Sequence, residues 1–293
     1  MNELARRQIR AASEQALRRA GVLGVVPTPL DAVSRAAGVT ETIDLSQLPK
    51  DLFARRPNVL KRVIGAMLYR PRVVVVDRSQ GHARGRFIEA HEISHKVIPW
   101  HEAVFRLDDE ERVFGQTKKR VDLEADVGAA ELLFQGDLFV RRALDFEVSI
   151  SAPIGLASDF DASMAASIRH YAVYHPDPVA VIVAGRFARS NGAVPVWATH
   201  ESPPFAARFG LAEGVFPGGI PASELSADPA GPIIHEALRF SDVAKGEVAL
   251  SDQRGESHAF VMEAFDNGRM VLVMLVEKRA SHTRGRSISV TAR

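Results

Sequence analysis

Residues 86–95 read RFIEAHEISH and end in an HExxH pattern, which decides how the N-terminal half of the chain is interpreted. Apolar residues recur at three- and four-residue spacing from here to Pro99, which predicts one amphipathic helix. Because four residues make about one helical turn, His91 and His95 lie on one face and can bind the same metal ion. Glu92 lies beside that face, where its carboxylate can take a proton from water and return it to a leaving amine.

The 293-residue chain has no cysteine, which excludes a disulfide framework, a thiolate nucleophile and cysteine-ligated zinc. Any metal site must therefore use histidine and carboxylate ligands, and we expect Zn2+ as the cofactor. The 37 basic and 36 acidic side chains leave a net charge of +1. This balance gives the whole molecule no attraction for nucleic acid or acidic membranes, so we expect neither as a direct partner.

A composition of 46% apolar and 25% charged residues is ordinary for a soluble globular protein. The longest strongly apolar runs, Val73–Val76 and Met270–Val276, are far shorter than the roughly 20 residues of a membrane-spanning helix. The Arg-rich stretch Met1–Val33 has no apolar run typical of a secretion signal. We therefore expect a cytoplasmic protein.

A catalytic zinc ion needs a third protein ligand, and a second predicted helix, Val121–Phe134, offers carboxylates. Asp122 and Asp126 lie one turn apart on one face of this helix. Asp122 can bind the metal while Asp126 accepts the free ring N–H of one histidine. Glu124 is the rival third ligand: its side chain is longer, but it points about 200° around the helix from Asp122.

A short strand, Val73–Val76, precedes the HExxH helix, as in zincin-type folds. The sequence also predicts a helix over Leu52–Leu68 and a charged loop over residues 102–119. Near the C-terminus, short β-branched and apolar runs separated by turn residues predict strands, and Asp266-Asn267-Gly268 predicts a hairpin turn.

The fold class that these patterns predict is α+β, in four segments. They are an N-terminal helical segment (1–48), a zincin-like metallopeptidase domain (49–150), a helix-turn-helix-like connector (151–177) and a β-rich C-terminal domain (178–293). The zincin-like domain holds the short strands and the HExxH helix. The connector consists of two short helices, and the prolines that follow it mark the change from helical to mostly β sequence.

Three further side chains are candidates to line a cleft or to donate a hydrogen bond to an oxyanion: His101, Tyr171 and Tyr174. His101 follows the HExxH helix directly, and we expect it in a loop at the rim of the cleft. Tyr171 and Tyr174 belong to a cluster of aromatic and histidine residues in the connector, for which core packing is the alternative role.

The HExxH helix and residues 122–133 (DLEADVGAAELL) together resemble the ImmA/IrrE family of metallo-endopeptidases, over roughly residues 50–145. The family pattern is an HExxH helix followed by a helix that reads about Glu-x-x-Ala-Asn-x-x-Ala-x-x-Leu-Leu. The resemblance implies His91 and His95 as metal ligands and Glu92 as catalytic base. This chain departs from it twice, with Asp122 in place of the ligand Glu and Asp126 in place of Asn. The shorter Asp122 keeps Glu124 open as the third ligand.

The resemblance implies a zinc-dependent endopeptidase whose protein substrate is a DNA-binding regulator, such as a helix-turn-helix repressor of a mobile element or a stress response. Cleavage in that family turns gene expression on. The β-rich C-terminal domain resembles, in architecture only, a sensor-like domain of some members. The departure at Asp122 motivates an alternative, a non-catalytic zincin-like partner of a regulator or toxin. A DNA-binding regulator is a further alternative, which predicts steeply salt-dependent DNA affinity.

Overall fold

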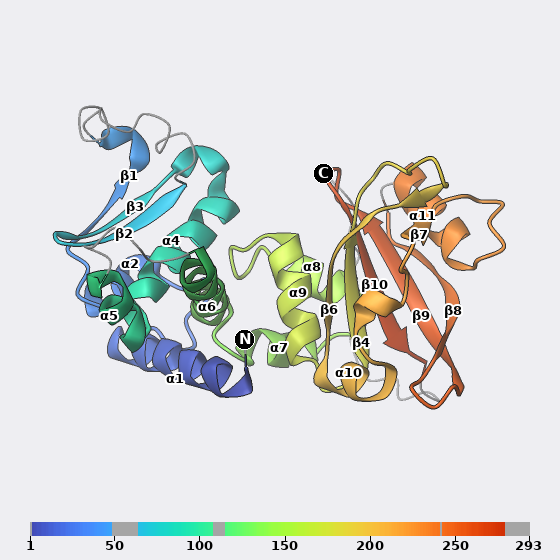
Figure 1. The fold of residues 1–293 in the computed structure, drawn as a ribbon, viewed down its shortest axis with the longest axis horizontal. Helices are drawn as coiled ribbons and strands as arrows, with labels where there is room; N and C mark the ends of the chain where they lie inside the picture. The colour runs from blue at the N-terminus through green and yellow to red at the C-terminus, as the bar shows by residue number, and fades with distance from the viewer. Residues whose placement is uncertain (1, 49–63, 108–114, 241, 279–293) are drawn as a thin grey trace. The chain divides into compact units, whose positions relative to one another are not determined.

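The computed structural model describes residues 2–48, 64–107, 115–240 and 242–278, which form an α+β protein (Figure 1). Its contacts divide the chain into two compact units. The first unit is Met1–Phe139 together with Asp159–Ser163, and the second is Val140–Ser158 together with Met164–Arg293. The two helices that the sequence predicts as a connector therefore belong to the second unit. Each unit has its own sheet.

The first unit contains a three-stranded sheet in the order β1-β3-β2, in which β1 runs parallel and β2 antiparallel to β3. Its elements are α1 (Glu3–Arg19), α2 (Leu30–Ala36), β1 (Glu41–Asp44), η1 (Leu45–Gln47), β2 (Gly65–Tyr69), β3 (Arg72–Val76), η3 (Arg78–Gln80), α4 (His82–Val97), α5 (Pro99–Leu107) and α6 (Gly115–Phe134). The helix α7 (Leu138–Ala143) runs from the first unit into the second.

The middle strand β3 confirms the predicted strand at Val73–Val76, and all four valines are buried. The predicted HExxH helix is confirmed as α4, which packs against β2, β3 and α6. Ala90 and Ile93 of α4 are fully buried. Asp161, from the short segment that rejoins the first unit, pairs with Arg86 near the start of α4 (Nε to Oδ2, 3.1 Å). These contacts fix the helix that carries the HExxH pattern.

Helices α4 and α6 approach each other closely because small residues face the contact. Ala125 and Ala129 are fully buried. A Cβ atom at Gly128 would lie 2.8 Å from both Cβ and Oγ of Ser94, so no side chain fits there without movement. The Ser94 hydroxyl donates to the Ala90 carbonyl (2.7 Å), which holds it in this contact.

Two predictions in this unit are wrong. The stretch 102–119 is not a loop at its ends, because α5 continues to Leu107 and α6 begins at Gly115. Pro99 begins α5 as well as limiting α4, a position in the first turn where proline is tolerated. Of the predicted helix Leu52–Leu68, residues 52–63 lie outside the described residues, and its end is strand. Gly65–Tyr69 pairs residue by residue with β3, which satisfies its backbone groups in a sheet.

The second unit is built on a five-stranded sheet in the order β6-β4-β10-β9-β8, with every pairing antiparallel. Its elements are α8 (Ser151–Leu156), α9 (Met164–Tyr174), β4 (Val179–Ala184), β5 (Ala193–Val194), β6 (Val196–Glu201), α10 (Pro203–Phe209), η4 (Ala212–Gly214), β7 (Ile220–Pro221), α11 (Ala230–Phe240), β8 (Ala244–Ser251), β9 (Ser257–Asp266) and β10 (Val271–Glu277). The predicted strands of the C-terminal part are confirmed, and α10 and α11 are additional.

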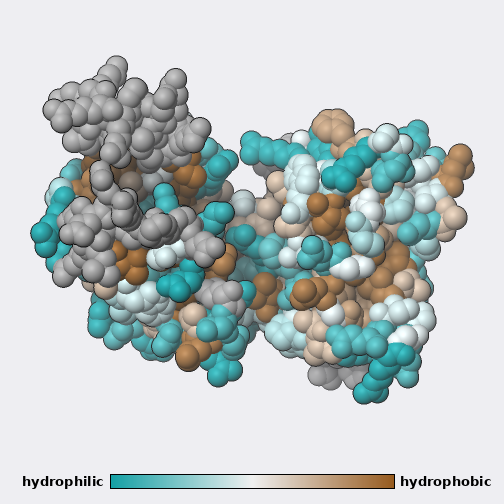
Figure 2. Space-filling model, viewed as in Figure 1, coloured by the Kyte–Doolittle hydropathy of each residue, from teal (hydrophilic) through white to brown (hydrophobic). Residues whose placement is uncertain are grey.

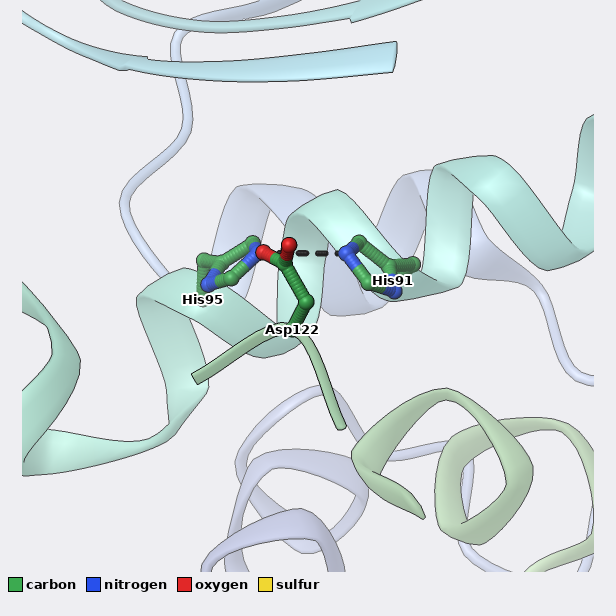
Figure 3. A group of neighbouring side chains, drawn as sticks. All are labelled: His91, His95 and Asp122. Carbon is green, nitrogen blue, oxygen red and sulfur yellow. Dashed lines mark hydrogen bonds between the residues drawn. The ribbon is translucent and has the colours of Figure 1, made fainter. Parts of the chain in front are cut away.

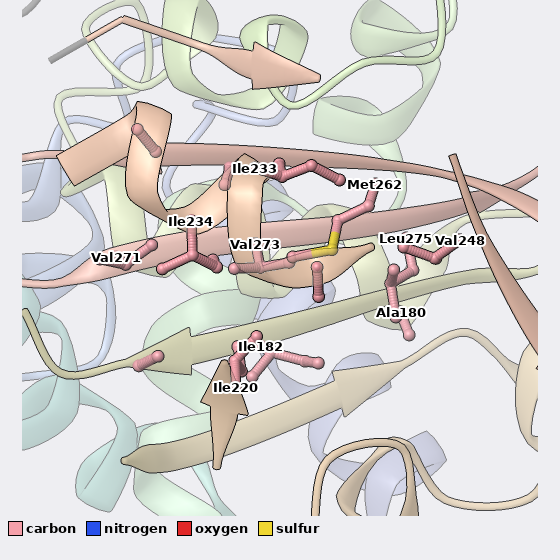
Figure 4. Close-up of a cluster of buried hydrophobic side chains, with 14 of the residues drawn as sticks. Ala180, Ile182, Ile220, Ile233, Ile234, Val248, Met262, Val271, Val273 and Leu275 are labelled. Atoms are coloured by element: carbon pink, nitrogen blue, oxygen red, sulfur yellow. The ribbon is translucent and has the colours of Figure 1, made fainter. Parts of the chain in front are cut away.

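Successive residues along each strand of this sheet point to opposite faces, and each face packs against a different set of helices. One face forms the core of Figure 4, where Met262 and Val273 meet Ile234 of α11. The opposite face carries Glu263, which is 2% exposed and accepts a hydrogen bond from the Ile150 N–H at the start of α8 (2.6 Å). The helices α8 and α10–α11 therefore cover opposite faces of the sheet.

The predicted hairpin turn joins β9 to β10. Gly268 has a positive φ of 82°, which glycine adopts easily. The Asn267 side chain accepts hydrogen bonds from the N–H groups of Arg269 and Met270, so the turn stabilises itself.

Within the described residues, no helix is both long enough and apolar enough to cross a membrane. Figure 2 shows hydrophobic residues interspersed with hydrophilic ones on the face in view.

The contact at Gly128 predicts a pair of opposite stability changes in the first unit. We expect Gly128→Ala to destabilise this unit by about 1–3 kcal/mol, because the new methyl group overlaps Ser94. Gly85, within α4, has no atom within 4 Å of the place of a Cβ, so Gly85→Ala should stabilise it by about 0.5–1 kcal/mol. Hydrogen exchange of the α4 and α6 amides measures both changes. Equal protection in the two variants would show that the α4–α6 contact is not close-packed.

Candidate metal centre

The side chains of His91, His95 and Asp122 converge in the first unit (Figure 3). Each offers one ligand atom, and the three atoms lie within 4.8 Å of one another. The Nε2 atoms of the two histidines are 3.2 Å apart. Two imidazole nitrogens and one carboxylate oxygen are a donor set that catalytic zinc sites use, so these residues fit a zinc ion.

His91 is oriented by the carboxylate that the sequence predicts. Its Nδ1–H donates to Oδ1 of Asp126 (2.8 Å), which leaves Nε2 directed toward His95 and Asp122. Burial opposes the charged form of this ring, but the hydrogen bond to Asp126 and the nearby carboxylates outweigh it and raise the pKa of His91. The ring is thus fixed by a partner outside the donor group, as is usual for metal-binding histidines.

His95 is 4% exposed, and its own environment keeps it neutral. Burial, and then the neighbouring imidazoles of His91 and His101, lower the pKa of His95 far below its ordinary value. The Tyr69 hydroxyl donates to the His95 carbonyl (2.8 Å), which ties the end of β2 to this turn of α4. A neutral imidazole is the form that binds a metal ion.

Glu92 is 7% exposed and lies against the first residue of β2. A Cβ atom at Gly65 would be 2.5 Å from Cγ2 of Ile88 and 2.7 Å from Oε1 of Glu92, so a side chain here would displace one or both of these groups. Burial raises the pKa of Glu92 to about 7, against the opposing effect of His91. A carboxyl group with a pKa near neutrality can both accept a proton and give it back.

Glu124, the rival third ligand, has other partners in the structure. Its Oε2 accepts hydrogen bonds from Nε2 of His101 (3.0 Å) and from Nε1 of Trp100 (2.6 Å). Asp122 is the α6 carboxylate that lies with the two histidines.

The sequence predicts His101 in a loop at the rim of a cleft, but the structure places it in the interior. His101 lies in α5 and is 0% exposed, and its Nδ1 is 3.0 Å from Nδ1 of His95. Helix α4 stops at Ile98, whose ψ of 113° turns the chain back toward His95. The end of α4 at this point brings His95 and His101, six residues apart, into contact. In the sequence, Pro99 is the local residue that indicates this helix end.

Tyr171 and Tyr174 lie in the second unit, on α9. The ring of Tyr171 contacts that of His175 (centroids 4.7 Å apart), and Tyr174 contacts His170 (4.5 Å). Tyr171 is 0% exposed, so its hydroxyl is closed to a substrate. Tyr171 therefore lies in the packed core, the alternative role that the sequence leaves open for it, whereas Tyr174 is partly buried.

Asp252 and Glu256 in the turn between β8 and β9, with His258 near the start of β9, form a second group of potential ligands. Asp252 accepts hydrogen bonds from the N–H groups of Arg254 and Glu256, and His258 lies 3.2 Å from its other oxygen. The hydrogen bonds that stabilise this turn explain why the three side chains lie close together.

No protein-family model matches the chain, and no curated protein matches it. A solved structure of a Mycobacterium tuberculosis transcriptional regulator has a similar fold, with a TM-score of 0.52 over 92% of this chain and 87% of that chain. The two sequences are 13% identical, so the similarity concerns the fold alone.

The donor geometry predicts which substitutions weaken metal binding. His91→Ala, His95→Ala and Asp122→Ala should each lower the affinity for Zn2+ at least about tenfold, because each removes one ligand atom. His258→Ala, near the start of β9, should leave the affinity unchanged and serves as the control. Titration of the purified protein with zinc against a chelator measures these affinities. Unchanged affinity in Asp122→Ala would exclude Asp122 as the third ligand.

Proposed function

We propose that the chain is a zinc-dependent endopeptidase, with a zincin-like first unit, that cleaves a regulatory protein such as a helix-turn-helix repressor. The observation that carries this proposal is the meeting of the HExxH helix with Asp122 of α6. Three ligand atoms lie within 4.8 Å, and the buried carboxylate of Glu92 is next to His91 in the chain. The resemblance of α4 and α6 to the ImmA/IrrE motifs supports the same activity.

Zinc at such a site supplies a Lewis acid that makes water nucleophilic near neutral pH and polarises a peptide carbonyl. Nε2 of His91, Nε2 of His95 and the Asp122 carboxylate would hold the ion. Glu92 accepts the proton that water loses as its oxygen bonds to the peptide carbon. Glu92 then gives this proton to the amide nitrogen as the C–N bond breaks, so one carboxyl group balances both steps.

The position of β2 supports a peptide substrate. Among the described residues β2 is an outer strand of its sheet, and its first residue, Gly65, abuts Glu92. A strand at the edge of a sheet can pair with an extended peptide through backbone hydrogen bonds. A peptide that pairs along β2 would pass beside Glu92.

Two observations support a regulatory protein as the substrate. The solved structure of similar fold is named a transcriptional regulator, which is in keeping with a role in gene regulation. The net charge of +1 favours a protein partner over DNA for that role.

The alternative is a non-catalytic partner that binds a regulator or toxin through the same unit. The short Asp122 side chain, where the ImmA/IrrE pattern has Glu, motivates this alternative.

Glu92→Gln separates the two functions. We expect cleavage to fall at least about 100-fold, because the amide cannot carry the proton, while zinc affinity and fold stay close to wild type. Glu89→Gln is the matched control: Glu89 is buried on the same helix and faces Arg78 (3.5 Å). Proteomic mapping of new N-termini, with each variant in place of wild type in the native host, identifies the substrate. If wild type and Glu92→Gln produce the same termini and the same protein levels, the chain is a binding partner and not a peptidase.

A further inference from the structure

We propose that His101 and Glu124 form a relay that sets the tautomer of His95 and so directs a lone pair of its Nε2 toward the metal. The relay consists of His95, His101 and Glu124, in that order. This proposal rests on the proposed function, because it assigns His95 as a metal ligand. His101 and Glu124 are then positioning residues, which act through His95.

The relay is a continuous chain of hydrogen-bonding atoms. Nδ1 of His95 is 3.0 Å from Nδ1 of His101, and Nε2 of His101 is 3.0 Å from Oε2 of Glu124. The three residues are 4%, 0% and 5% exposed, respectively. In such an interior, an unmade hydrogen bond costs about 1–3 kcal/mol, so the protons must occupy the positions that satisfy every link.

The proton positions follow from the two ends of the relay. The Glu124 carboxylate only accepts, so Nε2 of His101 carries a proton and donates it. Nδ1 of a neutral His101 is then an acceptor, which requires a proton on Nδ1 of His95. Neutral His95 therefore has no proton on Nε2. That atom is the one that faces Nε2 of His91, 3.2 Å away, and its lone pair can bind a metal ion.

The carboxylate at the end of the relay is held in place by a second donor. Trp100 donates its Nε1–H to the same Oε2 of Glu124 (2.6 Å). Arg120 lies near the other oxygen (Nε to Oε1, 3.7 Å). His101 contacts Nδ1 of His95, on the opposite side of the ring from Nε2. Glu124 contacts His101 and influences His95 only through that ring.

The relay explains why the two histidines have different partners. His91 donates directly to the carboxylate of Asp126, whereas His95 reaches a carboxylate only through the ring of His101. In a neutral imidazole, both arrangements leave Nε2 without a proton. The second keeps the negative charge of Glu124 two hydrogen bonds away from the metal.

The test reads the tautomer of His95 by NMR of its ring nitrogens in the full-length protein without metal, and the affinity for Zn2+ by titration. We expect wild type to carry the His95 proton on Nδ1. Glu124→Leu and His101→Phe remove one link each, and both should populate the Nε2–H tautomer and lower zinc affinity by about 10–100-fold. Circular dichroism shows whether each variant is folded.

Two conservative variants test the assignment of the links. Glu124→Gln can place its amide oxygen where Oε2 accepts from His101 and Trp100, so it should restore both the wild-type tautomer and zinc affinity. Trp100→Phe removes the second donor to Glu124 but neither hydrogen bond of the relay, so the His95 proton should stay on Nδ1 and zinc affinity should fall less than in Glu124→Leu.

The outcomes separate this proposal from the peptidase proposal. A wild-type His95 with its proton on Nε2, or a folded Glu124→Leu with an unchanged tautomer, overturns the relay. If the tautomers shift as expected but wild type binds no zinc, the relay is supported and the proposed function fails.

Discussion

The close packing of α4 against α6 is the constraint on which the donor cluster depends. The contact narrows at Gly128, where the backbone of α6 lies against Ser94. The carboxylates earlier in α6 are thereby held at fixed places along α4 and α5. Asp122 reaches both histidines, Asp126 reaches His91, and Glu124 reaches His101. A larger residue at position 128 would move all three carboxylates together, because they share one rigid helix.

The parts of the site that sequence could predict are those set by local periodicity. The four-residue spacing of His91 and His95, and of Asp122 and Asp126, places each pair on one helix face whatever surrounds it. The hydrogen bond between His91 and Asp126 follows once these two faces meet. The strand at Val73–Val76 was predictable because a run of β-branched residues suits a buried strand.

The parts that sequence could not predict depend on tertiary contacts or on irregular backbone. His101 is interior only because α4 stops at Ile98 and α5 starts at once. The strand Gly65–Tyr69 exists because β3 pairs with it, since its own sequence is equally compatible with a helix. The sequence does not predict α11, because Gly231 and Pro232 are typical of a turn. In the structure both fall in the first turn of the helix, where a proline is tolerated.

The way in which the chain is divided between the two units determines what a single proteolytic cut can release. The chain passes between the two units three times, since Asp159–Ser163 belongs to the first unit but lies between segments of the second. No single cut can therefore release two complete units. A fragment that ends at Phe139 would contain the whole donor cluster but lack Asp161, the carboxylate that pairs with Arg86 near the start of α4. Proteolysis between residues 140 and 158 would thus break the covalent connection between α4 and the segment that carries Asp161.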